Sequence, residues 1–244
     1  MRGVDEIRAL RAVLVDLDDT LYPQASWLAG AWERVVTAAT AHGVAPDRLR
    51  AALHAQARAG TARGGLIDAA LAAVGAADVP VPPLVAAFRA HAPNRLDPYP
   101  GVARAVVALR GAGLRLGVVT DGEPAGQRAK LTATGLAGLF DVVVCSDELG
   151  REHRKPSPRP YRDALQRLEV ATGEAAFIGD NPRTDIPGAI AVGLLALRVR
   201  TGEYADVPDA TAPWADVADL PAAVELLLSG ESLTAAPSQA ALRR

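Results

Sequence analysis

The sequence predicts an α/β protein whose core is a doubly wound parallel sheet, with a helical domain inserted after the first strand. Residues 12–17 begin with an uninterrupted apolar run, which is typical of a strand covered on both faces. From 97 to 229, short apolar runs alternate with segments of helical periodicity. From 27 to 92, apolar residues recur at helical spacing without a convincing strand.

The inserted segment contains four predicted helices. The first carries apolar residues at helical spacing from Trp27 to Ala39, and the second starts at Pro46, a residue type that favours the first helical turn. A third helix covers 66–74, and a fourth follows the proline-rich break at 80–83. We therefore expect a helical domain at 23–96.

The remaining elements follow from the same alternation of strand-length runs and helical periodicity. After the strand at 12–17, they are a helix at 102–111, a strand at 114–119, a helix at 124–134, a strand at 141–145, a helix around 161–168, a strand at 175–178, a helix at 185–192, a strand at 194–199 and a helix at 221–228. We expect 1–22 and 97–229 to form the core domain. The small, polar residues of 230–244 are expected to be a disordered tail.

Composition excludes several classes of protein. The 244 residues carry a net charge of −2 without a long run of one sign, which argues against a nucleic-acid partner. The first residues lack the apolar core of a signal peptide, and no apolar run is long enough to span a membrane. Cys145 is the single cysteine, which fits a reducing compartment. We expect a cytoplasmic protein, either a monomer or a homodimer, with no membrane partner.

Three carboxylates follow the first predicted strand within four residues: Asp16, Asp18 and Asp19. Ligands of open α/β sheets bind beyond the carboxyl ends of the strands, and carboxylates this close repel one another unless a cation neutralises them. A hard cation with oxygen ligands, such as Mg²⁺, suits them. The alternative is a polar turn in which Asp19 or Thr20 caps the next helix.

Polar residues also end two later strands, at Thr120-Asp121-Gly122 and at Gly179-Asp180, and another strand leads into the loop that contains Lys155. Because carboxyl ends of parallel strands meet at one edge of a sheet, these groups are expected to form a single site. Of 26 basic residues only Lys130 and Lys155 are lysines, so a lysine is not the default basic residue of this chain. Lys130 fits the exposed face of the helix at 124–134, and we assign it no role.

These motifs resemble, in order, those of the haloacid dehalogenase superfamily. Asp16–Thr20 matches the first motif, Thr120 followed by Asp121-Gly122 the second, Lys155-Pro156 the third, and Gly179–Asp185 the fourth. The helical insert resembles the C1-type cap of that family. The resemblance covers roughly 12–228, and it implies a Mg²⁺-dependent phosphatase that acts on a small phosphorylated metabolite through an aspartyl-phosphate.

The resemblance also implies roles for the aspartates. Asp16 would be the nucleophile and a metal ligand. Asp18 would protonate the leaving oxygen and then activate water, while its main-chain carbonyl binds the metal. Asp180 would be the second carboxylate on the metal, with Asp185 beside it or bound through water.

The other motif residues would bind the substrate. The Thr120 hydroxyl and the main-chain N–H groups around Asp121 and Gly122 would hold phosphoryl oxygens, and Lys155 would add positive charge and restrain Asp16. In the insert, Arg63 is the candidate for contacting the leaving group. Tyr22, Trp27 and Trp32 are further candidates for substrate specificity.

Three alternatives use related chemistry. A phosphomutase uses the same two aspartates. A 2-haloacid dehalogenase of this fold needs no metal and lacks an acid at the position of Asp18. A phospho-receiver domain, a regulatory protein rather than an enzyme, also combines clustered Asp, Thr and Lys, but it carries no helical insert.

Overall fold

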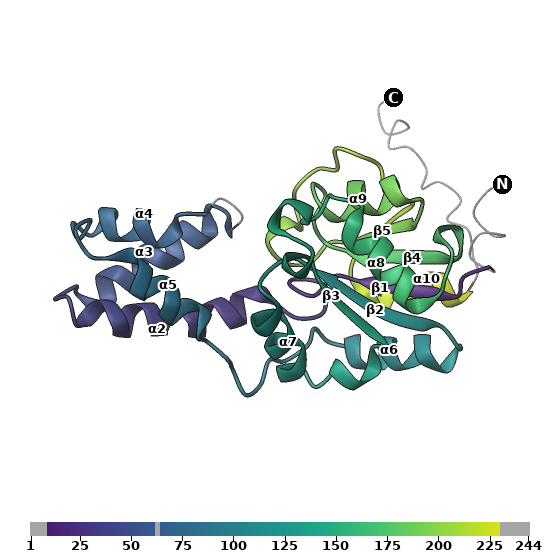
Figure 1. Ribbon diagram of the computed structural model, residues 1–244, viewed down its shortest axis with the longest axis horizontal. Coiled ribbons are helices and arrows are strands. Elements are labelled where there is room, and N and C mark those ends of the chain that lie inside the picture. Colours follow the sequence, from purple (N-terminus) through teal and green to yellow (C-terminus); the bar gives the residue numbers. More distant parts are fainter. Residues whose placement is uncertain (1–8, 62–63, 230–244) are drawn as a thin grey trace, which may run out of the picture.

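The computed structural model describes residues 9–61 and 64–229 (Figure 1). Its centre is a parallel six-stranded sheet with the order β3-β2-β1-β4-β5-β6. The strands are β1 (Ala12–Val15), β2 (Arg115–Thr120), β3 (Val142–Cys145), β4 (Ala175–Gly179), β5 (Leu195–Val199) and β6 (Ala215–Val217). The first four strands of this order, β3, β2, β1 and β4, are the ones that carry the predicted site motifs, so the motifs lie on adjacent strands.

Helices cover both faces of the sheet, as a doubly wound topology requires. On one face lie α6 (Val102–Gly111), α7 (Pro124–Ala133) and α10 (Leu220–Ser229), and on the other α8 (Arg159–Leu168) and α9 (Asp185–Val192). Successive residues of β1 point to opposite faces: Val13 packs in the first of these two hydrophobic clusters, and Leu14 packs in the second. Burial on both faces explains why the β1 sequence has no polar alternation.

Four helices lie between β1 and β2 in the chain: α2 (Gln24–Thr40), α3 (Pro46–Arg58), α4 (Leu66–Ala73) and α5 (Val81–Arg89). They form a separate lobe beside the sheet domain (Figure 1). The lobe has its own hydrophobic cluster, which includes Trp32, Leu49 and Leu71. Helix α2 joins the two lobes, because Trp27 in its first turn packs in a cluster of the sheet domain and Trp32 packs in the insert.

The sequence analysis anticipated this arrangement except at one edge of the sheet. The predicted core helices and strands are present within two residues of their expected bounds, and Cys145 is fully buried in β3. Strand β6 was not predicted, and it pairs with β5 over three residues only. The expected tail at 230–244 lies outside the described residues. Within 9–61 and 64–229, no helix combines the length and hydropathy needed to cross a bilayer.

Candidate active site

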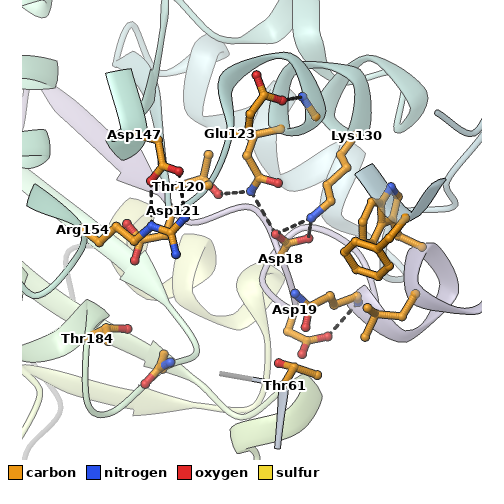
Figure 2. A pocket seen from close by; sticks show the side chains of 18 of the residues that line it. Asp18, Asp19, Thr61, Thr120, Asp121, Glu123, Lys130, Asp147, Arg154 and Thr184 are labelled. Atoms are coloured by element: carbon orange, nitrogen blue, oxygen red, sulfur yellow. Dashed lines mark hydrogen bonds and ion pairs between the residues drawn. The ribbon is translucent and has the colours of Figure 1, made fainter. Parts of the chain in front are cut away.

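The predicted site residues other than Arg63 meet at the carboxyl edge of the sheet, and Figure 2 labels Asp18, Thr120 and Asp121 among them. Asp16 follows β1, Thr120 ends β2, Asp180 follows β4, and Lys155 lies in the loop between β3 and α8. A cavity of about 740 Å³ extends from these residues to the helical insert. The insert contributes a largely apolar wall to it, made by Trp27, Leu28, Trp32, Leu66, Ile67, Val85 and Phe88.

Asp16, Asp180 and Asp185 form a buried cluster of carboxylates. One oxygen from each lies within 4.8 Å of the others. The Lys155 ammonium lies between two of them: it contacts Asp16 directly and lies 2.7 Å from Oδ1 of Asp185. Thr20 adds a weak hydrogen bond, its hydroxyl donating to Oδ1 of Asp180 at 3.4 Å. The ammonium of Lys155 therefore pairs with two of the three carboxylates, and Asp180 has no ion pair with it.

In the fourth motif, position 179 must be glycine because the Asp185 side chain packs against it. Asp185 begins α9, and its side chain points back over the end of β4. A Cβ atom at Gly179 would lie 2.4 Å from Oδ2 of Asp185, so only glycine permits this approach. The same Oδ2 accepts the main-chain N–H of Asn181 at 3.1 Å. This turn fixes Asp180 and Asp185 side by side although they are five positions apart in the sequence.

The electrostatics of this cluster favour a cation. Burial, reinforced by the Asp185 charge, raises the pKa of Asp16 well above its ordinary value even though Lys155 opposes the shift. Burial also raises the pKa of Asp180, with Asp185 and Asp16 as the next causes. For Lys155, burial would lower the pKa, but Asp16 and Asp185 outweigh it and raise the pKa. The donor set contains only oxygen and carries excess negative charge, as a Mg²⁺ site does.

Asp18 has a different environment from Asp16, two residues away. Its carboxylate accepts hydrogen bonds from the Tyr22 hydroxyl and from Gln127 Nε2, the latter at 3.0 Å. Lys130 Nζ bridges both oxygens at 2.9 and 3.0 Å (Figure 2). Burial alone would raise the pKa of Asp18, but the Lys130 charge and these hydrogen bonds outweigh it and hold the pKa below its ordinary value.

The predicted phosphate-binding residues lie beside both aspartates. The Thr120 hydroxyl is buried and accepts a hydrogen bond from Gln127 Nε2 at 2.6 Å, so one amide contacts both Thr120 and Asp18. Asp121 accepts the main-chain N–H of Lys155 at 3.0 Å, which connects the second motif to the third. Gly122 has a φ of 136°, a conformation that favours glycine at this turn.

Asp19 has a structural role in the turn that follows β1. It has a φ of 59°, and its carboxylate accepts the N–H of Gln24, the first residue of α2, at 2.8 Å. It also accepts the N–H of Glu203 at 3.0 Å. The capping role considered for Asp19 is therefore present, next to the carboxylate cluster rather than in place of it.

Hydrogen bonds between Thr61 and Glu203 tie the insert to the far side of the site. Thr61, in the loop after α3, donates its N–H to Glu203 at 3.0 Å and its hydroxyl at 2.6 Å. Glu203 follows β5, and its own N–H is the one that Asp19 accepts. The loop of the insert is thus linked through Glu203 to the turn that carries Asp16 and Asp18.

Some expectations about individual side chains need correction. Lys130 does not lie on the exposed face of its helix: it is 6% exposed and pairs with Asp18. Tyr22 is fully buried with its hydroxyl on Asp18, so it supports the acid rather than selecting a substrate. Trp27 and Trp32 do line the cavity. Arg63 lies outside the described residues.

Gln127 and Lys130 contact Asp18 but were not assigned to the site by the sequence analysis. They belong to the inner face of α7 together with Leu131 and Thr134, at spacings of three and four residues. Three of these four residues are polar, so the face does not stand out as hydrophobic. The scarcity of lysine, which drew attention to Lys155, applies equally to Lys130 and was the available signal.

Comparisons with known proteins agree with this geometry. The family model for the haloacid dehalogenase-like hydrolases matches residues 10–193. A glyceraldehyde 3-phosphate phosphatase of Methanopyrus kandleri is 34% identical over 205 residues, which cover 81% of this chain and 87% of that protein. A phosphoglycolate phosphatase of Rhodospirillum rubrum is 35% identical over 196 residues, covering 75% of this chain and 77% of the relative.

A solved structure also resembles the chain over nearly its full length. The HAD phosphatase from Thermococcus onnurineus superposes with a TM-score of 0.65 at 25% identity, covering 92% of this chain and 100% of that one. The family match spans most of the sheet domain and the whole insert, and includes all four motifs. The chain therefore belongs to the haloacid dehalogenase-like hydrolase family.

Proposed function

We propose that this protein is a Mg²⁺-dependent phosphatase that hydrolyses a small phosphorylated metabolite through an aspartyl-phosphate on Asp16. The observation that carries the proposal is the contrast between two neighbouring carboxylates. Asp16 lies in the carboxylate cluster against Lys155, whereas Asp18 is turned toward Gln127 and Lys130. Two acids held in different environments can divide nucleophilic attack and proton transfer between them. The names of the phosphatase relatives support the same reaction class.

In the first half-reaction, a carboxylate oxygen of Asp16 attacks phosphorus, and the bond from phosphorus to the ester oxygen breaks. Asp18 donates a proton to that leaving oxygen, so an alcohol departs. Thr120, the N–H groups near Asp121 and Gly122, and the Lys155 ammonium hold the phosphoryl oxygens. Holding these oxygens in place lowers the barrier, because the charge that spreads over them meets donors already oriented.

In the second half-reaction, water attacks the phosphorus of the aspartyl-phosphate. Asp18, now ionised, accepts the proton of that water, and the bond between phosphorus and the Asp16 oxygen breaks. Inorganic phosphate leaves, and both aspartates return to their starting states. The Lys130 ion pair favours the ionised Asp18 that this half-reaction needs, and it opposes the protonated Asp18 that the first half-reaction needs.

Asp16, Asp180 and Asp185 would hold Mg²⁺, with the main-chain carbonyl of Asp18 as a further oxygen donor. When bound, the ion supplies positive charge that lets a carboxylate approach the doubly negative phosphate. The cluster fits this ion because all its donors are carboxylates and one ammonium balances only part of their charge. That ammonium belongs to Lys155, so two negative charges of the three carboxylates would remain for the ion to neutralise.

The helical insert is proposed to act as a cap. In this proposal residues 23–96 close over a core made by 1–22 and 97–229, and the cavity between them admits a small phosphate ester. The apolar wall of the insert faces the leaving-group end of that cavity, while the carboxyl edge of the sheet faces the phosphate end. Closure of this kind excludes water while the aspartyl-phosphate forms.

The proposal predicts metal-dependent release of phosphate. The purified chain should hydrolyse p-nitrophenyl phosphate with Mg²⁺, lose the activity in EDTA and recover it when Mg²⁺ is restored. A panel that includes glyceraldehyde 3-phosphate and phosphoglycolate, measured by released phosphate, then tests the substrate. Full activity without metal would contradict the proposal, as would dehalogenation of a 2-haloacid without release of phosphate from any ester.

Thermal unfolding provides a control that does not depend on activity. Mg²⁺ should raise the Tm of the wild-type protein, because the ion binds the folded carboxylate cluster. Asp180→Asn should abolish that rise and should itself unfold at a higher temperature than metal-free wild type, because it removes one of three crowded buried charges. For a chain of this size, each kcal/mol shifts Tm by roughly 2–4 °C.

The contact between Thr61 and Glu203 provides a test of the cap. Glu203→Ala removes a carboxylate that accepts two hydrogen bonds from Thr61, and charged hydrogen bonds contribute about 1.5–3 kcal/mol before exposure reduces them. We expect KM to rise roughly 3- to 10-fold with little change in kcat, since each 1.4 kcal/mol corresponds to about tenfold. Glu33→Ala is the matched control, because Glu33 pairs with Arg50 inside the insert. An unchanged KM would show that this contact does not hold the cap.

A further inference from the structure

We propose that Lys130 is a positioning residue for proton transfer: with Gln127 and Tyr22 it fixes the Asp18 carboxylate in the orientation that serves the leaving group and the attacking water. This inference rests on the proposed phosphatase function, in which Asp18 is the proton-transfer group. It adds a residue outside the four motifs, on helix α7.

The Lys130 ammonium forms its ion pair with Asp18. Its ammonium lies 2.9 and 3.0 Å from the two carboxylate oxygens of Asp18, so it bridges them rather than binding one. The Lys130 side chain is 7% exposed and that of Asp18 is 18% exposed, which shields this ion pair from water. A bridging cation resists rotation of a carboxylate more than a single hydrogen bond does.

An aromatic ring beside the Lys130 ammonium helps to hold it against Asp18. The Trp27 ring, on the first turn of α2, lies over Lys130 Nζ at 4.2 Å from its centroid. An ammonium against an aromatic face gains attraction there and loses access to water on that side. Trp27 belongs to the helix that joins the insert to the sheet domain, so the lysine lies where the two lobes meet.

The remaining donors explain why a bridging cation is needed. Tyr22 binds one oxygen of Asp18, and Gln127 binds the other while also donating to Thr120. Asp18 is two residues from Asp16, whose charge repels it. Without Lys130, these two neutral donors alone oppose rotation of the carboxylate. A displacement of about 1 Å in a catalytic group can cost on the order of 100-fold in rate.

The test uses two aryl phosphates of nearly equal shape, p-nitrophenyl phosphate and phenyl phosphate. Nitrophenolate departs without a proton, whereas phenolate is more basic and benefits from one. In rapid-quench single turnovers of the full chain with Mg²⁺, Lys130→Met should slow phosphoenzyme formation from phenyl phosphate by roughly 10- to 100-fold. Formation from p-nitrophenyl phosphate should change by about threefold or less, because positioning matters only where a proton is transferred.

Three further variants separate positioning from a merely structural role. Lys130→Arg should restore most of the rate with phenyl phosphate, because a guanidinium can also bridge both oxygens. Arg128→Met removes a cation from the exposed side of the same helix and should leave both rates unchanged. In an Asp18→Asn background, Lys130→Met should cause no further change in the ratio of the two rates, since its partner is gone. Lys130→Gln replaces the Met variant if that variant fails to fold.

The outcomes are distinguishable from failure of the phosphatase proposal. If wild type forms no phosphoenzyme, the proposed function fails and the role of Lys130 with it. If Asp18→Asn slows both substrates equally, Asp18 is not the proton-transfer group, so the role of Lys130 fails while the phosphatase function stands. If wild type and Asp18→Asn behave as expected but Lys130→Met slows both substrates equally, or neither, the positioning role alone is wrong. An effect of Lys130→Met that persists undiminished in the Asp18→Asn background would also overturn it.

Discussion

Asp16→Asn should abolish hydrolysis of every phosphate ester, whatever its leaving group, by more than ~10⁴-fold in kcat. In the proposed mechanism an oxygen of Asp16 forms the bond to phosphorus, and a neutral amide is a far weaker nucleophile. The loss should be equal for p-nitrophenyl phosphate and for phenyl phosphate, because the nucleophile is required whatever the leaving group. Steady-state release of phosphate with Mg²⁺ present measures this.

The geometry also predicts that Asp16→Asn remains folded. The substitution keeps the shape of the side chain and removes one of three clustered carboxylates, two of which pair with the ammonium of Lys155. Thermal unfolding of the metal-free variant should therefore occur at or above the wild-type temperature. Asp47→Asn is the control, since Asp47 is an exposed acid on α3 that pairs with Arg50. Turnover by Asp16→Asn within tenfold of wild type would show that Asp16 is not the nucleophile.

The sheet and the position of the site could be predicted because each depends on local patterns. β1 and β4 are buried on both faces, and their sequences are continuous apolar runs that end in Asp16 and in Gly179-Asp180. Parallel pairing then places those ends at one edge without further information. Strand β6 lacked such a pattern, since it is three residues long with Asp216 at its centre, and it forms because β5 offers a partner.

The network around Asp18 could not be predicted in the same way. The sequence places Lys130 on a helix, but whether it faces solvent depends on how α7 packs against the sheet. The helix turns Gln127 and Lys130 inward because the carboxyl edge of the sheet presents acids there instead of an apolar surface. The sharing of α2 between two hydrophobic clusters is likewise a tertiary property, which periodicity within the helix does not reveal.

Asp18→Asn should slow phosphoenzyme formation more for substrates with a basic leaving group than for substrates with a weakly basic one. Proton transfer contributes ~100- to 10,000-fold to catalysis, and it contributes most when the departing oxygen is basic. Phosphoenzyme formation from phenyl phosphate should therefore fall within that range, while formation from p-nitrophenyl phosphate should fall by less than about tenfold. Asn keeps the shape of the Asp18 side chain and one of its two acceptor oxygens, so the loop that carries Asp16 should keep its shape.

The same variant should then trap its intermediate. The water that hydrolyses the aspartyl-phosphate gives its proton to Asp18, and an amide cannot accept it. With p-nitrophenyl phosphate, Asp18→Asn should release one nitrophenolate per enzyme in a rapid burst, followed by a slow steady state. Acid quench should recover the phosphate covalently bound to protein. If no phosphoenzyme accumulates and both aryl phosphates slow equally, Asp18 supports the structure of the loop, and another group must transfer the proton.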